Sequence, residues 1–165
     1  MADEKEVKGL GGWLLLLALG LFLTPIRLLS VDLPMFNALL SSIDVEQFTT
    51  PGSEFYHPWW LTIVRFEMFY HFAMLIASLY LIYLFFSKHH WFPRVYITVL
   101  SVSIVYVLVD SWMVSLLFGE QPLVERATWI DLVRLLITAC IWIPYLLLSK
   151  RVQNTFVEGK KSSVE

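Results

Sequence analysis

Three ionisable residues lie close together in 63-IVRFEMFYHF-72, a stretch that is otherwise apolar. They are Arg65, Glu67 and His71. A carboxylate and an imidazole four positions apart share one face of a helix, where they suit acid–base chemistry or pH-dependent binding. Arg65 is two positions from Glu67 and lies on the other side of such a helix, so these two side chains cannot pair within it.

The chain around this stretch is too apolar for a soluble domain. Of its 165 residues, 58% are hydrophobic, whereas soluble proteins contain about 45–50% apolar residues. A membrane-spanning helix needs about 20 mostly apolar residues, and four such runs occur. They are continuously apolar rather than alternating, which excludes the strands of a membrane barrel. The predicted spans cover about residues 10–30, 58–87, 95–118 and 127–149.

These spans predict an all-α fold, in which one membrane domain forms an antiparallel four-helix bundle. Residues 31–57 are predicted to form an outer loop, and residues 150–165 a basic cytoplasmic tail with Phe156 at the membrane interface. Apolar residues in the outer loop recur at helical spacing and predict a short amphipathic helix on the outer interface. These residues are Phe36, Leu39, Leu40 and Ile43.

Basic residues are distributed unevenly between the two sides of the predicted membrane domain. Eight lie on the side that holds both termini, whereas Arg126 is the one basic residue in the opposite loops. Because positive residues are retained on the cytoplasmic side, both termini are predicted to be cytoplasmic. The acidic outer loop, which contains Asp32, then faces outward. The eight residues are Lys5, Lys8, Lys88, Arg94, Lys150, Arg151, Lys160 and Lys161.

Each of the other spans carries polar residues along one face as well. A charge that faces lipid costs about 2.5–3.5 kcal/mol on insertion scales, so these faces are predicted to turn inward, in the outer half of the membrane. The three faces comprise Gly20, Thr24 and Arg27; Ser103, Tyr106 and Asp110; and Asp131, Arg134 and Thr138. The residues predicted to line a ligand-binding pocket open to the outside are Arg27, Arg65, Glu67, His71, Asp110, Asp131 and Arg134.

The charges in these spans nearly cancel, which predicts ion pairs between them. We expect Glu67 to pair with His71 or an arginine, and Asp131 to pair with Arg134 three positions later. Asp110 is expected to pair with an arginine of another span. The partner is predicted to be Arg27 or Arg65.

Hypotheses from three functional classes are compatible with this pattern. In the first, a non-enzymatic membrane protein binds a small polar solute or a lipid headgroup in the pocket, or assists transport as a homo-oligomer. In the second, the charges hold the helices together or bind a membrane protein partner, as in a structural or accessory subunit. In the third, Glu67 and His71 act as acid and base in an intramembrane enzyme, although no nucleophile lies at a suitable spacing.

Other classes of site find little support. The net charge of −2 does not favour binding to nucleic acid. Cys140 is the one cysteine, which excludes an intramolecular disulfide and a cysteine-based metal cluster. One glutamate and one histidine in the spans are too few for a di-metal helix-bundle site. The sequence therefore predicts no metal and no cofactor.

Two stretches near the ends of the chain resemble a known bacterial family. They are 9-GLGGWLLLLALGLFLTPIRLL-29 and 139-ACIWIPYLLLSKRVQNTFV-157. They are similar to members of domain-of-unknown-function family 2569, which are small four-helix inner-membrane proteins. The resemblance extends over nearly the full length, and the C-terminal motif is its most specific part. It implies the fold and an inner-membrane location, but the family has no established activity to transfer.

Overall fold

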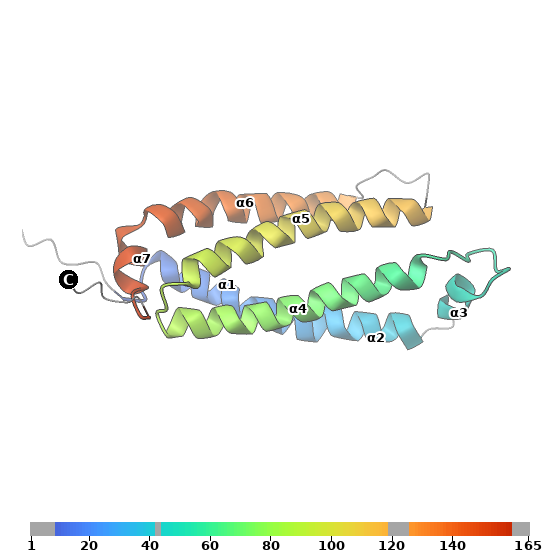
Figure 1. Cartoon of the computed structure of the whole chain (residues 1–165), viewed down its shortest axis with the longest axis horizontal. Helices are drawn as coiled ribbons and strands as arrows, with labels where there is room; N and C mark the ends of the chain where they lie inside the picture. Colours follow the sequence, from blue (N-terminus) through green and yellow to red (C-terminus); the bar gives the residue numbers. More distant parts are fainter. Residues whose placement is uncertain (1–8, 42–43, 119–125, 160–165) are drawn as a thin grey trace, which may run out of the picture.

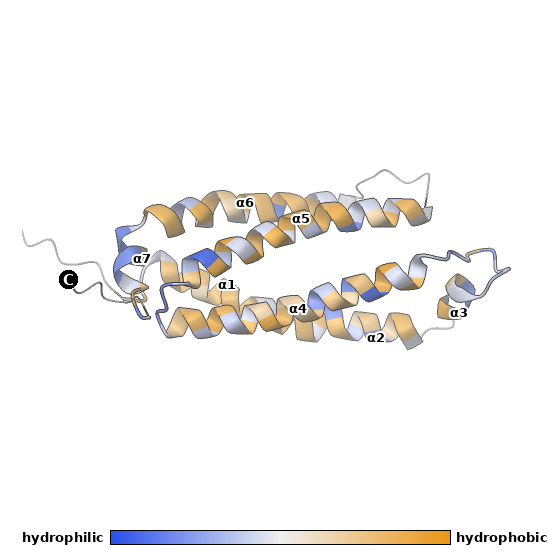
Figure 2. Ribbon diagram, viewed as in Figure 1, coloured by the Kyte–Doolittle hydropathy of each residue, from blue (hydrophilic) through white to orange (hydrophobic). Residues whose placement is uncertain are grey.

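The computed structural model describes residues 9–41, 44–118 and 126–159. Within these residues, four helices are long and apolar enough to cross a membrane, and they lie alongside one another (Figures 1 and 2). They confirm the helical character of the predicted spans; Lys5, Lys8, Lys160 and Lys161 fall outside the described residues. The elements are α1 (Trp13–Arg27), η1 (Leu28–Asp32), α2 (Leu33–Ser41), α3 (Asp44–Thr49), α4 (Trp60–Phe86), α5 (Phe92–Phe118), α6 (Arg126–Leu148) and α7 (Lys150–Thr155).

The first long helix is much longer than the sequence predicts. The elements α1, η1 and α2 follow one another without a break, so that the helix runs from Trp13 to Ser41. The prediction that the first span ends near residue 30 and passes into a loop is therefore wrong. The segment expected to lie on the interface continues this helix instead, and its Phe36 is buried. Ile43 lies outside the described residues.

A π-helical turn, η1, carries the chain past a proline inside this long helix. Pro34 has no N–H to donate to the carbonyl of Ser30, and its ring disturbs a regular α-helical turn. In the wider turn that precedes it, the Leu33 N–H donates to the carbonyl of Leu28, five residues back. Such a turn inserts one residue and rotates all positions after it relative to those before it. As a result, Asp32 is buried although it lies in the middle of a helix.

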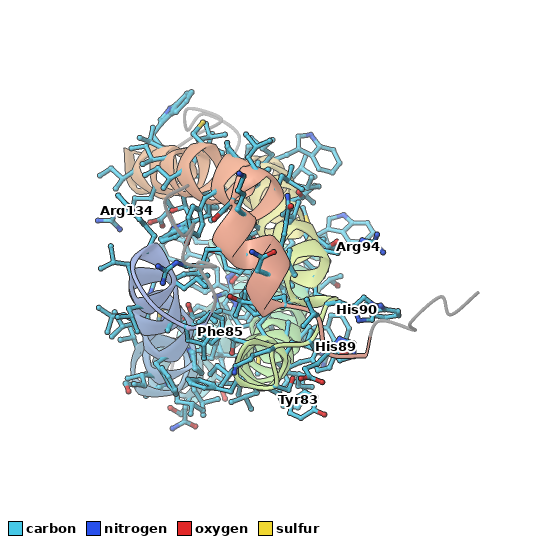
Figure 3. The ribbon with its side chains drawn as sticks, turned by 90° about the vertical axis from the view of Figure 1, so that its left-hand side faces the viewer. Tyr83, Phe85, His89, His90, Arg94 and Arg134 are labelled. Atoms are coloured by element: carbon cyan, nitrogen blue, oxygen red, sulfur yellow. The ribbon has the colours of Figure 1, made fainter. Side chains whose placement is uncertain are left out.

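The long helices pack in the order in which they follow along the chain. Contacts join α1 to α4, α4 to α5 and α5 to α6, while η1 also contacts α4. In the view along the helices, α1, α4, α5 and α6 succeed one another around the molecule (Figure 3). Many large apolar side chains of these helices are exposed, which suits helices that face lipid.

The apolar core lies at the end of the molecule where α1 begins and α6 ends, which we call the terminal end. Leu14, Leu17 and Leu21 of α1 meet Leu84 and Phe85 of α4 there, and all five are at most 5% exposed. The three α1 residues are spaced three or four apart, and Leu84 and Phe85 follow the buried Leu81 by three and four positions, so one face of each helix is covered.

The segment after α6 closes this core. The chain turns at Ser149 into α7, which lies across the terminal end (Figure 1). The ring of Phe156 stacks on Phe92 at 4.6 Å and contacts Phe85 at 5.7 Å. Val152 is 1% exposed and Phe156 is 5% exposed. Phe156, expected at the membrane interface, is thus a core residue.

The segment α7 and the described residues after it contact both the residues before α1 and the α4–α5 turn. The Gly9 N–H donates to Thr155 Oγ1 at 2.9 Å. A Cβ on Gly11 would approach the Arg151 guanidinium to 2.7 Å, so a glycine permits this close packing. Farther along, the His90 N–H donates to the Glu158 carbonyl at 3.1 Å.

Candidate functional site

The best-connected polar group in the middle of the molecule is the imidazole of His71. Its Nδ1 lies 2.8 Å from the backbone carbonyl of Glu67, one turn earlier in α4. Its Nε2 lies 3.6 Å from Oδ2 of Asp32 on η1. The side chains of Asp32 and His71 are 11% and 27% exposed, so the pair is mostly shielded. His71 therefore links two helices that are distant in the sequence.

These contacts determine where the protons of the pair can be. A carbonyl oxygen can only accept, so Nδ1 of His71 carries the proton in the contact with Glu67. Nε2 then faces the carboxylate of Asp32. If the ring were neutral and Asp32 ionised, two acceptors would face each other, which is unfavourable. Nε2 of His71 and the carboxyl group of Asp32 are thus two sites between which one further proton can be held.

The π-turn positions two residues against His71. Asp32 is the last residue of η1, and Phe36 follows one helical turn later in α2. Both are buried, at 8% and 4% exposure. The Phe36 ring meets the imidazole edge-on, with centroids 5.1 Å apart. The carboxylate and the aromatic ring together fix the imidazole from the side of the first helix.

Aromatic residues of α4 and α5 hold the imidazole from the other side. The rings of Tyr70 and Tyr106 are stacked, with centroids 3.3 Å apart and planes inclined by 2°. His71 meets both rings edge-on, at 5.6 Å and 6.3 Å. The Tyr106 hydroxyl donates to Oδ1 of Asp110 at 3.3 Å, and the Tyr70 hydroxyl is hydrogen-bonded with Ser103. We call Asp32, Glu67, Tyr70, His71, Tyr106 and Asp110 the His71 cluster.

The His71 cluster has an excess of negative charge when its carboxyl groups are ionised. It contains three carboxyl groups and one imidazole. Glu67 and Asp110 are near enough to repel each other, whereas Asp110 is attracted to His71. A proton or a small cation among these groups would relieve the repulsion, while an anion would increase it. The cluster therefore favours a positively charged occupant.

The structure brings together three of the seven residues predicted to line a pocket. Glu67, His71 and Asp110 belong to the cluster, whereas the three predicted arginines are exposed on the surfaces of their helices. The expected pair of Asp131 with Arg134 is formed, at 3.2 Å. It lies outside the cluster, as do the arginines. The arginines are Arg27, Arg65 and Arg134.

The other expected ion pairs are not formed among the described side chains. Asp110 is bonded to Tyr106 rather than to an arginine. Glu67 contacts His71 through its backbone carbonyl rather than through its carboxylate. Within the described residues, the contacts within 4.0 Å between acidic and basic groups are His71–Asp32 and Arg134–Asp131.

Sequence reasoning missed Asp32 and Tyr70 as members of the cluster. The sequence places Asp32 in the outer loop, because it predicts that the first span ends near residue 30. The signal that could have found it is the run from Trp13 to Ser41, which contains no helix-terminating glycine after Gly20 and keeps an aromatic residue four positions after Asp32. Tyr70 precedes His71 directly, and only its contact with α5 reveals its role.

An apolar groove of about 360 Å³ lies beside the cluster, between α4 and α5. The stacked rings of Tyr70 and Tyr106 line both the groove and the cluster, so that they separate His71 from the groove. The groove differs in character from the polar, outward-open pocket expected from the sequence. The remaining residues that line it are Phe66, Ser101, Val102, Val105 and Val109.

Within the described residues, no group of three or more histidine, cysteine or acidic side chains is arranged to hold a metal ion. Cys140 is exposed on α6 and takes no part in the cluster. The chemistry that the titratable groups of the His71 cluster offer is the binding and release of protons.

Comparison with known proteins gives one family. Residues 7–157 match the family described as "Protein of unknown function (DUF2569)". The chain belongs to the DUF2569 family. No curated protein and no solved structure matches it.

The two terminal motifs of this DUF2569 protein lie against each other. The glycines of the N-terminal motif lie against α7, where Gly9 bonds to Thr155 and Gly11 approaches Arg151. Val152 and Phe156 of the C-terminal motif are buried and close the core at the same place. The two motifs therefore form one packed unit, at a distance from the His71 cluster along the helices.

Proposed function

We propose that this DUF2569 protein is a multi-pass membrane protein that binds a proton at the His71 cluster and assists proton-linked transport of a small polar solute. The observation that carries the proposal is the position of His71 between the Glu67 carbonyl and the Asp32 carboxylate, at 2.8 Å and 3.6 Å. This arrangement places a titratable imidazole beside a carboxyl group within a helical region that is apolar enough to cross a membrane.

The same proposal includes the placement of the protein in a bacterial inner membrane. We propose an antiparallel four-helix bundle with both termini in the cytoplasm, supported by the excess of lysine and arginine at the terminal end. Lys88, Arg94, Lys150 and Arg151 all lie at that end, beside the α4–α5 turn or in α7. Trp59 is 61% exposed just before α4, at the opposite end, where an aromatic residue anchors a helix to the interface.

Charge favours a proton or a cationic solute over the anionic ligands that the arginines suggested. The three arginines are exposed outside the cluster, and the groups near His71 are mainly acidic. A lipid phosphate or another anion would meet repulsion there. The cluster therefore supports a cationic partner for this site, and a neutral polar solute is compatible with it when the cluster is protonated.

The second candidate function is that of an accessory subunit, in which the His71 cluster only holds the helices together. The link between η1 and α4 through His71 and Asp32 is the observation that favours it. An intramembrane enzyme is less compatible with the geometry, because His71 bonds to the backbone of Glu67 rather than to its carboxylate. That geometry does not pair Glu67 with His71 as the acid and base of the enzyme hypothesis.

Proton flux into liposomes tests the transport proposal. Purified protein is reconstituted with a pH-sensitive dye inside, and a pH gradient is applied with potassium and valinomycin to compensate charge. We expect faster dissipation of the gradient than in empty liposomes, and loss of this effect in His71→Gln. Arg65→Gln, which changes an exposed charge on the same helix, is the matched control. Flux that persists in His71→Gln, or its absence in the wild type, would contradict the proposal and leave the accessory role.

A further inference from the structure

Two exposed arginines lie at the same distance from the terminal end. Arg27 is 14 positions after the start of α1 at Trp13, and Arg134 is 14 positions before the end of α6 at Leu148. At about 1.5 Å per residue, each is about 21 Å from that end. The helix from Trp13 to Ser41 has 29 residues, so Arg27 stands at its middle. On α6 the same level is six residues, or about 9 Å, from Thr128, so both arginines lie in the half of the α6 span that is farther from the terminal end.

Both arginines lie on the side of the molecule between α1 and α6. The rings of Trp13 and Trp142 meet there, with centroids 6.5 Å apart. Arg27 is fourteen residues after Trp13, and Asp131 is eleven residues before Trp142, which places each on the helix face of its tryptophan. Arg134, paired with Asp131 at 3.2 Å, projects from α6 on the side of α1 (Figure 3).

Farther from the terminal end than the two tryptophans, the described residues do not fill this side. Within the described residues, α1 packs on α4 and η1, and α6 packs on α5 and α7. A Cβ added to Gly20 would meet no atom within 4 Å. The Thr24 hydroxyl donates to the Gly20 carbonyl of its own helix, at 3.0 Å. The face of Gly20, Thr24 and Arg27 is therefore open to whatever surrounds the protein.

Contact with lipid is unfavourable for this face, because it carries charged side chains. The side chains of Arg134 and Asp131 are 71% and 47% exposed, and Arg27 is exposed as well. Arg134 is about 9 Å and Asp131 about 4.5 Å from the Thr128 end of the α6 span, so both lie within the part of the helix that is apolar enough to cross a membrane. Charges at such depth normally face protein or water, and pair with one another.

We propose that a second copy of this chain covers the α1–α6 side in a two-fold dimer. A two-fold axis along the helices keeps equal depths opposite each other and sets α1 of one copy against α6 of the other. Arg27 then pairs with Asp131 of the second copy, and the reciprocal pair forms at the same time. Gly20 permits the close approach of the two helices.

Charge complementarity is what selects this occupant. Arg134 of one copy lies at the same level as Arg27 of the other. Asp131 is three residues, or about 4.5 Å along the helix, from that level. This offset is within the length of an arginine side chain. In the dimer each Asp131 carboxylate lies between Arg134 of its own chain and Arg27 of the other copy. The arrangement is self-complementary, as an interface between identical copies requires.

The mass of the purified protein in detergent, measured by light scattering after size exclusion, tests the proposal. We expect a dimer for the wild type and monomers for Arg27→Asp and for Asp131→Arg, each of which sets like charges opposite each other. Arg65→Asp, an exposed arginine on α4, is the matched control and stays dimeric. Thermal melting of each variant identifies any that fails to fold.

A mixture of the two reversed variants gives the decisive result, even if each alone is unstable. One copy with Arg27→Asp and one with Asp131→Arg restore both reciprocal pairs, so co-expression with two different tags is expected to yield a mixed dimer. A monomeric wild type, a dimer that tolerates both reversals, or a failure of the mixture to pair would each overturn the proposal. A monomer that loses bound anionic lipid in Arg27→Gln would assign this face to lipid phosphate instead.

Discussion

Nε2 of His71 lies 3.6 Å from Oδ2 of Asp32 and joins α4 to the π-helical turn of the first helix. Because Nδ1 of the same ring is occupied by the Glu67 carbonyl, the ring has no freedom to turn away from the carboxylate. A turn that accommodates a proline thus also positions an acidic residue against a titratable base. Pi-turns are often found at functional sites for this kind of reason.

The protonation of His71 can be measured directly. With ¹⁵N-labelled histidine, we expect Nδ1 of His71 to carry a proton whether the ring is neutral or charged, since it donates to a carbonyl. In Asp32→Asn the new amide can donate to Nε2, so the ring remains neutral with Nε2 unprotonated. The His71→Gln spectrum assigns the signal among the histidines. A neutral His71 that carries its proton on Nε2 would show that the described contacts do not persist.

Two substitutions of Asp32, compared by their free energies of unfolding, distinguish the loss of its contact with His71 from the loss of its charge. Asp32→Ala leaves Nε2 of a mostly shielded ring without a partner, which costs about 1–3 kcal/mol. Asp32→Asn retains a polar partner and is expected to cost much less. Arg65→Gln, at an exposed position of α4, is the control and should remain near the wild type. Equal losses in the two Asp32 variants would mean that the negative charge itself stabilises the fold.

The apolar character of the chain was sufficient to predict its long helices. Predicting the His71 cluster also required knowing where the first helix ends. Four long apolar runs can satisfy their backbone groups in a membrane only as helices, so their existence follows from composition and length. The end of the first span was less evident, because Arg27, Asp32 and Pro34 all indicate a boundary. In the structure the helix continues through these three residues by means of a π-turn. A search for a regular periodicity of 3.6 residues does not detect such a turn.

Pairing between charges was predictable only within a helix. Asp131 and Arg134 are three positions apart and pair as their spacing requires. Which residues pair between two helices depends on the rotation of each helix about its axis and on the depth of each residue in the membrane. Both differ from the prediction for Asp32, because the first helix is longer than expected. His71 therefore met Asp32 rather than an arginine. The tail was misjudged for another reason, since its basic residues concealed the apolar face that buries Val152 and Phe156.

Closure of the terminal end by Phe156 can be tested by truncating its side chain. Phe156→Ala removes a ring that stacks on Phe92 at 4.6 Å and is 5% exposed. Loss of a buried phenyl ring costs about 3–5 kcal/mol, so a large decrease in the melting temperature is expected. Phe69→Ala, at a position 70% exposed, should change it little. If the two variants melt alike, the C-terminal segment does not close the core.

Removal of the charge on Asp110 tests whether the His71 cluster is retained for stability. Asp110→Asn keeps the oxygen that accepts from the Tyr106 hydroxyl and removes the repulsion with Glu67. We therefore expect the melting temperature to hold or to rise. A gain on the order of 1 kcal/mol would correspond to about 2–4 °C for a chain of this size.

Asp110→Leu is the control, because it leaves the Tyr106 hydroxyl without its acceptor and should lower stability by about 1–3 kcal/mol. If Asp110→Asn melts as low as Asp110→Leu, the ionised carboxylate stabilises the helices and the accessory role gains. If it melts higher, the chain keeps a destabilising charge beside His71, as a site that must bind and release a proton requires.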